Sequence, residues 1–383
     1  ILEVSKSTET MNDFSVFKKI NQIIAEDSKS ATYKLALLRG TIDIIIENSP
    51  YIEKDESRVH IPMGLLIEKW ILYYYPLYAA DVDLRQITSP RTAFEKYLLP
   101  IIDYYKQKNG ISMFYNDLTV NGIPEEINSK VIDLVKQLRK TIVTQPMHYI
   151  GSSIEAQGQI FIPKPIQKRL HSTQPFSKSI LIESMGSFSI PRDYNDAFQV
   201  LGSFINGQES ILVQWAQFSH RLSKNASVEK VLSTLQETPI VKRDAEESKA
   251  KFKALTEDKV QRLQCIWSGE IIKGNTYHVD HIIPFSIWKN NDLWNLLPAS
   301  QSYNSSKSNS IPSPDLIRKQ RELFYYYWDI IRAENTALFD AQLQLTLLGN
   351  EPITNWKEAA IEQLASTSQY LIEDRGFKSW TPN

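Results

Sequence analysis

The sequence contains a single cysteine, Cys265, among 383 residues. One cysteine excludes a disulfide framework within the chain, and it also excludes a zinc cage built from Cys-x-x-Cys pairs. The lone thiol best fits a small buried apolar position. Because this cysteine content suits a reducing compartment, we expect a cytoplasmic protein.

Long apolar runs are equally scarce. The longest, residues 65–80, includes Glu68 and Lys69, whereas a membrane span needs roughly 18–20 predominantly apolar residues. The first residues lack the basic-then-apolar pattern of a secretory signal. We therefore expect neither a membrane span nor export.

No excess of either charge is present, since forty-three basic side chains oppose forty-four acidic ones. Proteins that bind nucleic acid unaided usually have a basic excess. Binding would therefore need a local basic patch, a protein partner or a second copy of the chain. Residues 164–224 hold seven basic and four acidic side chains, so they form either such a patch or an ordinary solvated surface. The candidate DNA-binding residues are Lys164, Lys168, Arg169, Arg221 and Lys224.

Helical spacing of apolar residues dominates most of the chain. Helices are expected over 31–47, 63–79, 93–106, 124–140, 193–204, 210–222, 315–332, 335–348 and 355–373, with a charged helical connector over 242–259. From about residue 148 the composition shifts toward Ser, Gln, Gly and Pro, and short apolar runs occur at 159–163 and 179–183. Residues 180–190 predict a hairpin with Gly186 in its turn.

The informative stretch lies between Cys265 and Pro312. It reads Cys-Ile-Trp-Ser-Gly-Glu at 265–270, Tyr-His-Val-Asp-His-Ile-Ile-Pro at 277–284, Trp-Asn-Leu-Leu-Pro at 294–298 and Tyr-Asn-Ser-Ser-Lys-Ser-Asn at 303–309. Glycines at 269 and 274 separate two short apolar segments, which predicts a hairpin with 277–283 as its second strand. A loop bounded by two prolines follows, and then a short helix from about residue 302. The expected order is strand, strand, loop, helix.

This order resembles the ββα-metal fold of the HNH nucleases. The Asp-His-x-x-Pro core and two later asparagines are similar to the family's H-N-N form, because Asn295 follows His281 by fourteen residues and Asn304 follows Asn295 by nine. These intervals, with Cys-Ile-x-Ser-Gly before and Lys-Ser after, look like the HNH domain of RNA-guided CRISPR nucleases. The resemblance covers residues 264–314. We expect an α+β, mostly helical protein with a ββα-metal (HNH) module embedded among helical regions.

Four segments follow from this reasoning. We expect a helical N-terminal domain at 1–145, and a mixed α/β segment with a charged connector, a candidate DNA- or partner-contacting region, at 146–258. The HNH module occupies 259–314, and C-terminal helices occupy 315–383.

Hydrolysis of a phosphodiester needs a deprotonated water, charge neutralisation on the phosphoryl oxygens and help for the departing 3′ oxygen. His281 is the expected general base, because imidazole titrates near working pH. Asp280 and Asn304 offer oxygen ligands to one divalent ion, Mg²⁺ or Mn²⁺. Asn295 is expected to hold His281 in its productive orientation. Lys307, one turn after Asn304, is a candidate phosphate contact.

Several alternatives stay open within the motif. His278 is the rival base, although only His281 has a proline three residues later. Asn309 could replace Asn304 as the metal ligand. Trp288 and Trp294 are expected to pack the long loop rather than stack on bases. Because adjacent strand residues face opposite sides, Asp280 and His281 should lie where the strand ends.

The motif predicts a metal-dependent endonuclease that cleaves DNA. The segments Thr-Tyr-Lys-Leu-Ala-Leu at 32–37 and Leu-Leu-Ile-Glu-Lys-Trp at 65–70 are similar to those of uncharacterised bacterial HNH proteins, which implies a role in restriction or anti-phage defence. A homing or nicking endonuclease is the alternative enzyme. The competing class is a catalytically silent DNA-binding module with an HNH fold, although the four intact motif residues argue against it.

Overall fold

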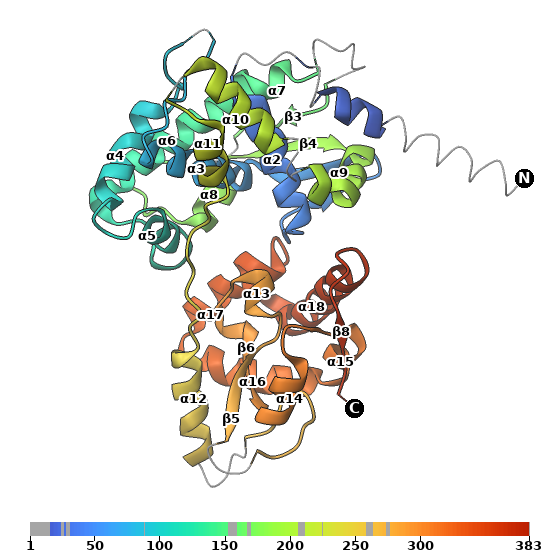
Figure 1. Ribbon diagram of the computed structural model, residues 1–383. Helices are drawn as coiled ribbons and strands as arrows, with labels where there is room; N and C mark the ends of the chain where they lie inside the picture. Colours follow the sequence, from blue (N-terminus) through green and yellow to red (C-terminus); the bar gives the residue numbers. More distant parts are fainter. Residues whose placement is uncertain are drawn as a thin grey trace, which may run out of the picture. The chain divides into compact units, whose positions relative to one another are not determined.

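The computed structural model describes residues 16–23, 27, 31–87, 89–151, 159–166, 170–205, 211–223, 225–257, 263–272 and 276–382. It divides the chain into two compact units, Ile1–Ile240 and Val241–Asn383. Both are mainly helical with small sheets, which confirms the expected α+β, mostly helical class (Figure 1). Of the helices in these ranges, none combines the length and apolar character that crossing a membrane requires.

The first unit is organised around two buried helices, α2 (Tyr33–Ile46) and α3 (Met63–Ala79), as their apolar spacing predicted. A four-stranded sheet in the order β1-β2-β4-β3 packs beside them, with β2 (Arg58–Pro62) antiparallel to β4 (Ser187–Pro191). Gly64 lets α3 approach α8 (Lys178–Ser184), because a Cβ there would lie 2.4 Å from the Leu181 carbonyl oxygen.

The remaining elements of this unit are β1 (Glu53–Lys54), α4 (Glu95–Tyr105), α5 (Ile111–Asn116), η1 (Asp117–Asn121), α6 (Glu125–Thr144), α7 (Pro146–Tyr149), β3 (Ile162–Pro163), α9 (Arg192–Ile205), α10 (Ile211–Leu222) and α11 (Val228–Leu235). Among them, four helices (α4, α6, α9 and α10) match predicted ones, whereas α5, η1, α7 and α11 were not predicted.

The predicted hairpin over 180–190 is wrong, because its first half is helix α8. The Ser177 side chain accepts a hydrogen bond from the Ile180 amide and so caps this helix, which buries Leu181 and Ile182. Gly186, with φ of 71°, turns the chain from α8 into β4. The apolar run therefore reflects a buried helix face, which short runs do not distinguish from a strand.

The second unit has one continuous hydrophobic core, running from Phe252 to Trp380. The helices after the motif thus share their core with the motif itself. The elements are α12 (Glu246–Glu257), β5 (Tyr277–His281), α13 (Phe285–Trp288), η2 (Leu293–Asn295), β6 (Leu296–Ser300), α14 (Gln301–Lys307), β7 (Ile311–Pro312), α15 (Pro314–Lys319), α16 (Arg321–Glu334), α17 (Thr336–Leu343), η3 (Gln344–Leu348), η4 (Ile353–Asn355), α18 (Trp356–Glu373) and β8 (Ser379–Trp380). The helix predicted over 315–332 is interrupted at Gln320, between α15 and α16.

The motif folds as two antiparallel strands joined by a long loop and followed by a helix. β5 pairs with β6 from Tyr277 opposite Ser300 to His281 opposite Leu296, and α14 packs against both strands (Figure 1). The predicted strand order is wrong in one respect. Among the described residues before β5, an isolated bridge joins Gln264 and Ile271, and the partner of β5 comes after the loop. Gly274, in the expected hairpin turn, lies outside the described residues.

Candidate active site

The end of β5 sets Asp280 and His281 side by side in the interior. His281 is the last residue of the strand, and both side chains are buried. The expectation that this pair lies where the strand ends is confirmed.

Asp280 lies in a buried pocket between an indole and an ammonium group. Its Oδ2 accepts a hydrogen bond of 2.8 Å from Trp267 Nε1, and Lys307 Nζ lies 3.3 Å from the carboxylate. The same ammonium donates to the His281 carbonyl oxygen at 2.7 Å. Burial raises the pKa of Asp280 and lowers the pKa of Lys307, while their mutual attraction opposes both shifts.

Lys307 therefore does not point outward as a surface phosphate contact would. Its side chain has no exposed area, and its contacts tie α14 to the end of β5. In this structure it acts as an internal counter-charge for Asp280.

The His281 imidazole is only 1% exposed, and it packs edge-on against Phe285 with ring centroids 5.4 Å apart. Burial lowers its pKa to about 4, so the ring is neutral near pH 7. Its Nε2 lies 3.4 Å from Asn291 Oδ1. Its Nδ1 is buried and has no hydrogen-bond partner among the residues that the structure describes.

Asn291 determines which imidazole nitrogen carries the proton. Its Oδ1 accepts from the Asp244 amide at 3.0 Å, and its Nδ2 donates to the Lys242 carbonyl at 2.7 Å, which fixes the orientation of the amide. Because the atom facing His281 Nε2 is an acceptor, Nε2 carries the proton. Nδ1 is then the nitrogen with a free lone pair.

Asn295 is fully buried, but its contact differs from the expected one. Its Oδ1 accepts from the Ile283 amide at 2.9 Å, and its Nδ2 donates to the Ile283 carbonyl at 3.2 Å. Its own carbonyl oxygen accepts from the Ile282 amide at 2.8 Å. Asn295 therefore holds the main chain that follows His281 rather than the imidazole ring.

The Asn304 side chain, on α14, contacts the His278 side chain of β5. Its Nδ2 lies 3.1 Å from His278 Nδ1, and both side chains reach solvent. His278 and Asp280 lie two residues apart and so share a face of β5. Asn309 is exposed and lies beyond the end of α14.

The long loop is packed by its tryptophans, as predicted. Trp294 is buried, contacts Trp288 with ring centroids 5.9 Å apart, and donates to Thr346 Oγ1 at 3.0 Å. Cys265 is buried, also as predicted, and its Sγ accepts from the Ser300 amide.

Trp267, Asn291 and Arg243 were missed by sequence reasoning. Trp267 lies within the Cys-Ile-x-Ser-Gly segment at its variable position, and Asn291 is one of two adjacent loop asparagines. No spacing rule separates them from ordinary packing and turn residues. The contacts of Trp267 with Asp280 and of Asn291 with His281 become visible only in the folded structure.

The candidate DNA-binding residues lie in the first unit. Lys164 follows β3 and Arg221 lies in the last turn of α10, and both are exposed. Lys168, Arg169 and Lys224 lie outside the described residues.

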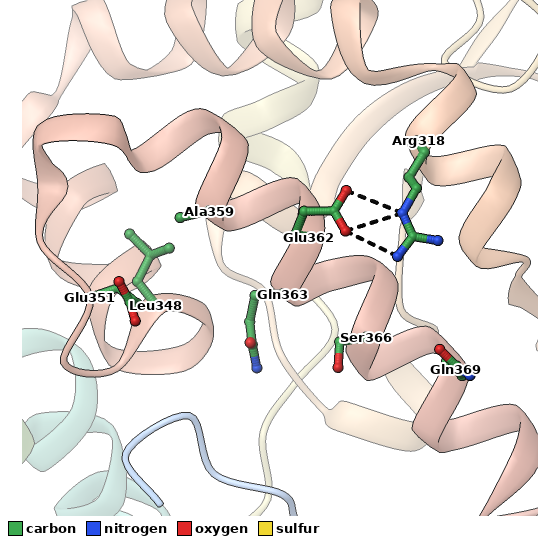
Figure 2. Close-up of a pocket in the computed structure, with 8 residues that line it drawn as sticks. All are labelled: Arg318, Leu348, Glu351, Ala359, Glu362, Gln363, Ser366 and Gln369. Carbon is green, nitrogen blue, oxygen red and sulfur yellow. Dashed lines mark hydrogen bonds and ion pairs between the residues drawn. The ribbon is translucent and has the colours of Figure 1, made fainter. Parts of the chain in front are cut away.

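A pocket of about 490 Å³ lies in the second unit, lined by side chains of α15, η3 and α18 among others. Figure 2 shows Glu362 facing Arg318, which donates three hydrogen bonds of 3.0–3.1 Å to its carboxylate. No motif residue lines this pocket, so it is separate from the group around His281.

Comparison with known proteins agrees with this geometry. A family model described as "HNH endonuclease" matches residues 265–313, which contain Asp280, His281, Asn295, Asn304 and Lys307. The second unit therefore contains an HNH endonuclease module. A second model, "Domain of unknown function (DUF8808)", matches residues 13–235. This match spans more than half of the chain, and the protein belongs to that family. No curated protein matches the chain.

Proposed function

We propose that the protein is a metal-dependent endonuclease that hydrolyses DNA phosphodiester bonds, with His281 as its general base. The main support for this proposal is the state of the His281 imidazole. The ring is neutral, and its Nδ1 is buried without a hydrogen-bond partner among the described residues. A buried nitrogen without a hydrogen-bond partner needs an explanation, and a catalytic role is one such explanation. In an HNH endonuclease module, that explanation is proton transfer from the attacking water.

The surrounding residues support this role. Asn291 Oδ1 keeps the proton on Nε2, so Nδ1 can accept the proton of water. Asn295 fixes the main chain after His281, which limits how far the ring can move. Lys307 links the His281 carbonyl to the Asp280 carboxylate, which holds the proposed metal ligand against the main chain of the proposed base.

The residues present fit a divalent ion. Asp280 and Asn304 supply carboxylate and amide oxygens from β5 and α14, which pack together, and hard oxygen donors suit Mg²⁺ or Mn²⁺. The Lys307 ammonium, 3.3 Å from Asp280, is a cation already drawn to this carboxylate. Groups of three His, Cys, Asp or Glu side chains suited to a metal do not occur in the described ranges, and the proposed pair combines one carboxylate with one amide. When bound, the ion would neutralise charge on the phosphate and the leaving oxygen.

We further propose the finer assignment to the H-N-N form similar to CRISPR HNH domains, and a role in restriction or anti-phage defence. The first rests on the intervals between His281, Asn295 and Asn304. The second rests on resemblance alone, and fold-level likeness is a weaker argument than site chemistry. The four segments proposed from the sequence, and a protein partner or homo-oligomer, belong to the same proposal.

The test uses the full chain with supercoiled plasmid, linear duplex, single-stranded DNA and RNA. Cleavage is expected with Mg²⁺ or Mn²⁺, and His281→Ala should reduce it ~10²–10⁴-fold while leaving the fold intact. His278→Ala is the matched control. If His278→Ala is inactive and His281→Ala is not, the base is His278. A well-folded wild type that cleaves none of these substrates would favour the silent DNA-binding module, whereas nicking alone would favour the nicking endonuclease.

A further inference from the structure

The segment Lys242–Asp244, just before α12, is tied to the loop of the active site. Asn291 Nδ2 donates to the Lys242 carbonyl at 2.7 Å, and the Asp244 amide donates to Asn291 Oδ1 at 3.0 Å. The main chain on both sides of Arg243 is thus fixed by one side chain. Asp244 Oδ1 also accepts from the Glu246 amide at 2.9 Å, which joins the segment firmly to α12.

The side chain that anchors this segment is the one that faces the base. Asn291 Oδ1 lies 3.4 Å from His281 Nε2. The loop around Asn291 is itself restrained, because Asp292 Oδ2 accepts from Thr346 Oγ1 at 2.7 Å and from Trp294 Nε1 at 3.2 Å. His281, the loop around Asn291 and the segment Lys242–Asp244 are therefore joined by hydrogen bonds into one unit, which we call the frame.

Arg243 is the residue whose main chain these hydrogen bonds hold on both sides. It is exposed, and no hydrogen bond or ion pair involves its side chain within the described ranges. Burial is the largest influence on the pKa of Asp280, His281 and Lys307, and the positive charge of Arg243 is a smaller influence on all three. Lys307, by contrast, is buried against Asp280. Arg243 is thus an exposed cation on the segment that is hydrogen-bonded to Asn291, the residue that faces His281.

We propose that Arg243 binds a phosphate of the nucleic-acid strand beside the cleaved bond, and that Asn291 is the positioning residue that holds Arg243 and His281 in one frame. The proposal rests on the proposed nuclease function and adds the group that recognises the anion. A guanidinium can donate two parallel hydrogen bonds to one phosphate, which fixes orientation as well as position. Binding the phosphate at a fixed distance from the imidazole would align the water that the imidazole activates with the phosphorus atom.

The first experiment measures binding without cleavage. Full-length His281→Ala protein is titrated with a labelled DNA duplex, and separately with single-stranded DNA, over a series of salt concentrations. Adding Arg243→Ala should weaken binding and reduce the salt slope by ~0.9 for duplex or ~0.7 for a single strand, the value of one lost phosphate contact. Arg243→Lys should keep the slope. The matched control is Arg321→Ala, which removes an exposed arginine of α16 that pairs with Glu322.

The second experiment measures cleavage. Arg243→Ala should lower kcat/KM about 10- to 100-fold, the effect of losing a charged hydrogen bond. Asn291→Ala should lower kcat about 10²-fold, because both Arg243 and His281 lose their common anchor. Asn290→Ala is its control, since the hydrogen bonds of Asn290 in the described part of the chain go to Asp292 and not to His281 or to the segment around Arg243. A purely structural Asn291 would change thermal stability and leave kcat at the level of Asn290→Ala.

The outcomes separate this proposal from the nuclease function itself. If the wild type cleaves, and Arg243→Ala matches Arg321→Ala in salt slope and kcat/KM, the Arg243 assignment is wrong and the function stands. If the wild type binds DNA without cleaving it, a reduced slope for Arg243→Ala still supports the phosphate contact while the nuclease function fails. If the folded wild type binds no nucleic acid at any salt concentration, both are overturned.

Discussion

Replacing Asn295 by alanine should loosen the turn after His281 and slow cleavage together. The Asn295 side chain is fully buried and satisfies both the amide and the carbonyl of Ile283. A buried polar group left without its partner costs ~1–3 kcal/mol, so the two groups together cost ~2–6 kcal/mol. Water entering the space of the lost side chain would bond to part of these groups. We therefore expect a loss of about 2–4 kcal/mol in the local free energy of unfolding around Ile283.

Amide hydrogen exchange is the suitable assay, because a chain of two units need not unfold in one step. A local loss of about 2 kcal/mol speeds exchange roughly 30-fold, and peptides containing Ile282 and Ile283 should show it. Cleavage should fall about 10²-fold, because the base is no longer held in place. Asn335→Ala is the control: it removes the cap of α17 in the same unit and should change neither readout. Unchanged exchange at Ile283 in Asn295→Ala would refute the reasoning.

Three further changes test the charges around the site and on the first unit. Lys307→Met should destabilise the second unit by ~3–5 kcal/mol, because Asp280 is left buried and unpaired, and adding Asp280→Asn should restore most of the loss in urea unfolding; a single variant as stable as the wild type would contradict this. Asp280→Asn and Asn304→Ala should both abolish cleavage, and a chelator should silence the wild type until Mg²⁺ or Mn²⁺ is restored; full activity in excess EDTA would exclude the metal site. Lys164→Glu with Arg221→Glu should weaken DNA binding and flatten its salt dependence; unchanged titrations would remove that surface from consideration.

The helices could be predicted where apolar spacing was long and regular. The helix expected over 63–79 coincides with α3, and that expected over 31–47 contains α2. Prediction failed over 180–190, where a short apolar run was compatible with either a strand or a helix, and the Ser177 cap decided for helix α8. The local pattern of apolar residues therefore predicted the long helices correctly. It did not predict a helix of only about two turns, such as α8.

Strand pairing in the motif was the other failure, and its cause is also physical. Gly269 and Gly274 separate short apolar segments, as turn residues do in a hairpin, which favours pairing of neighbouring segments. In the structure β5 instead pairs with β6 across a loop in which Asp292 accepts hydrogen bonds from Trp294 of the same loop and from Thr346 of η3. Such bonds hold the loop in place between the two strands, and the spacing of residues in the sequence does not indicate them.

The spacing of residues in the sequence was equally uninformative about the contacts that the site residues make. The intervals among His281, Asn295 and Asn304 identified residue types whose chemistry suits phosphodiester hydrolysis. They carried no information on contacts. Asn295 turned out to hold the main chain of Ile283, because pairing of β5 with β6 brings those two residues together at the end of the ladder. The residue that contacts the imidazole is Asn291, which also holds the main chain on both sides of Arg243. Contacts of this kind depend on segments distant in sequence, so the anion-facing arginine can be recognised only once the loop and the segment before α12 are folded together.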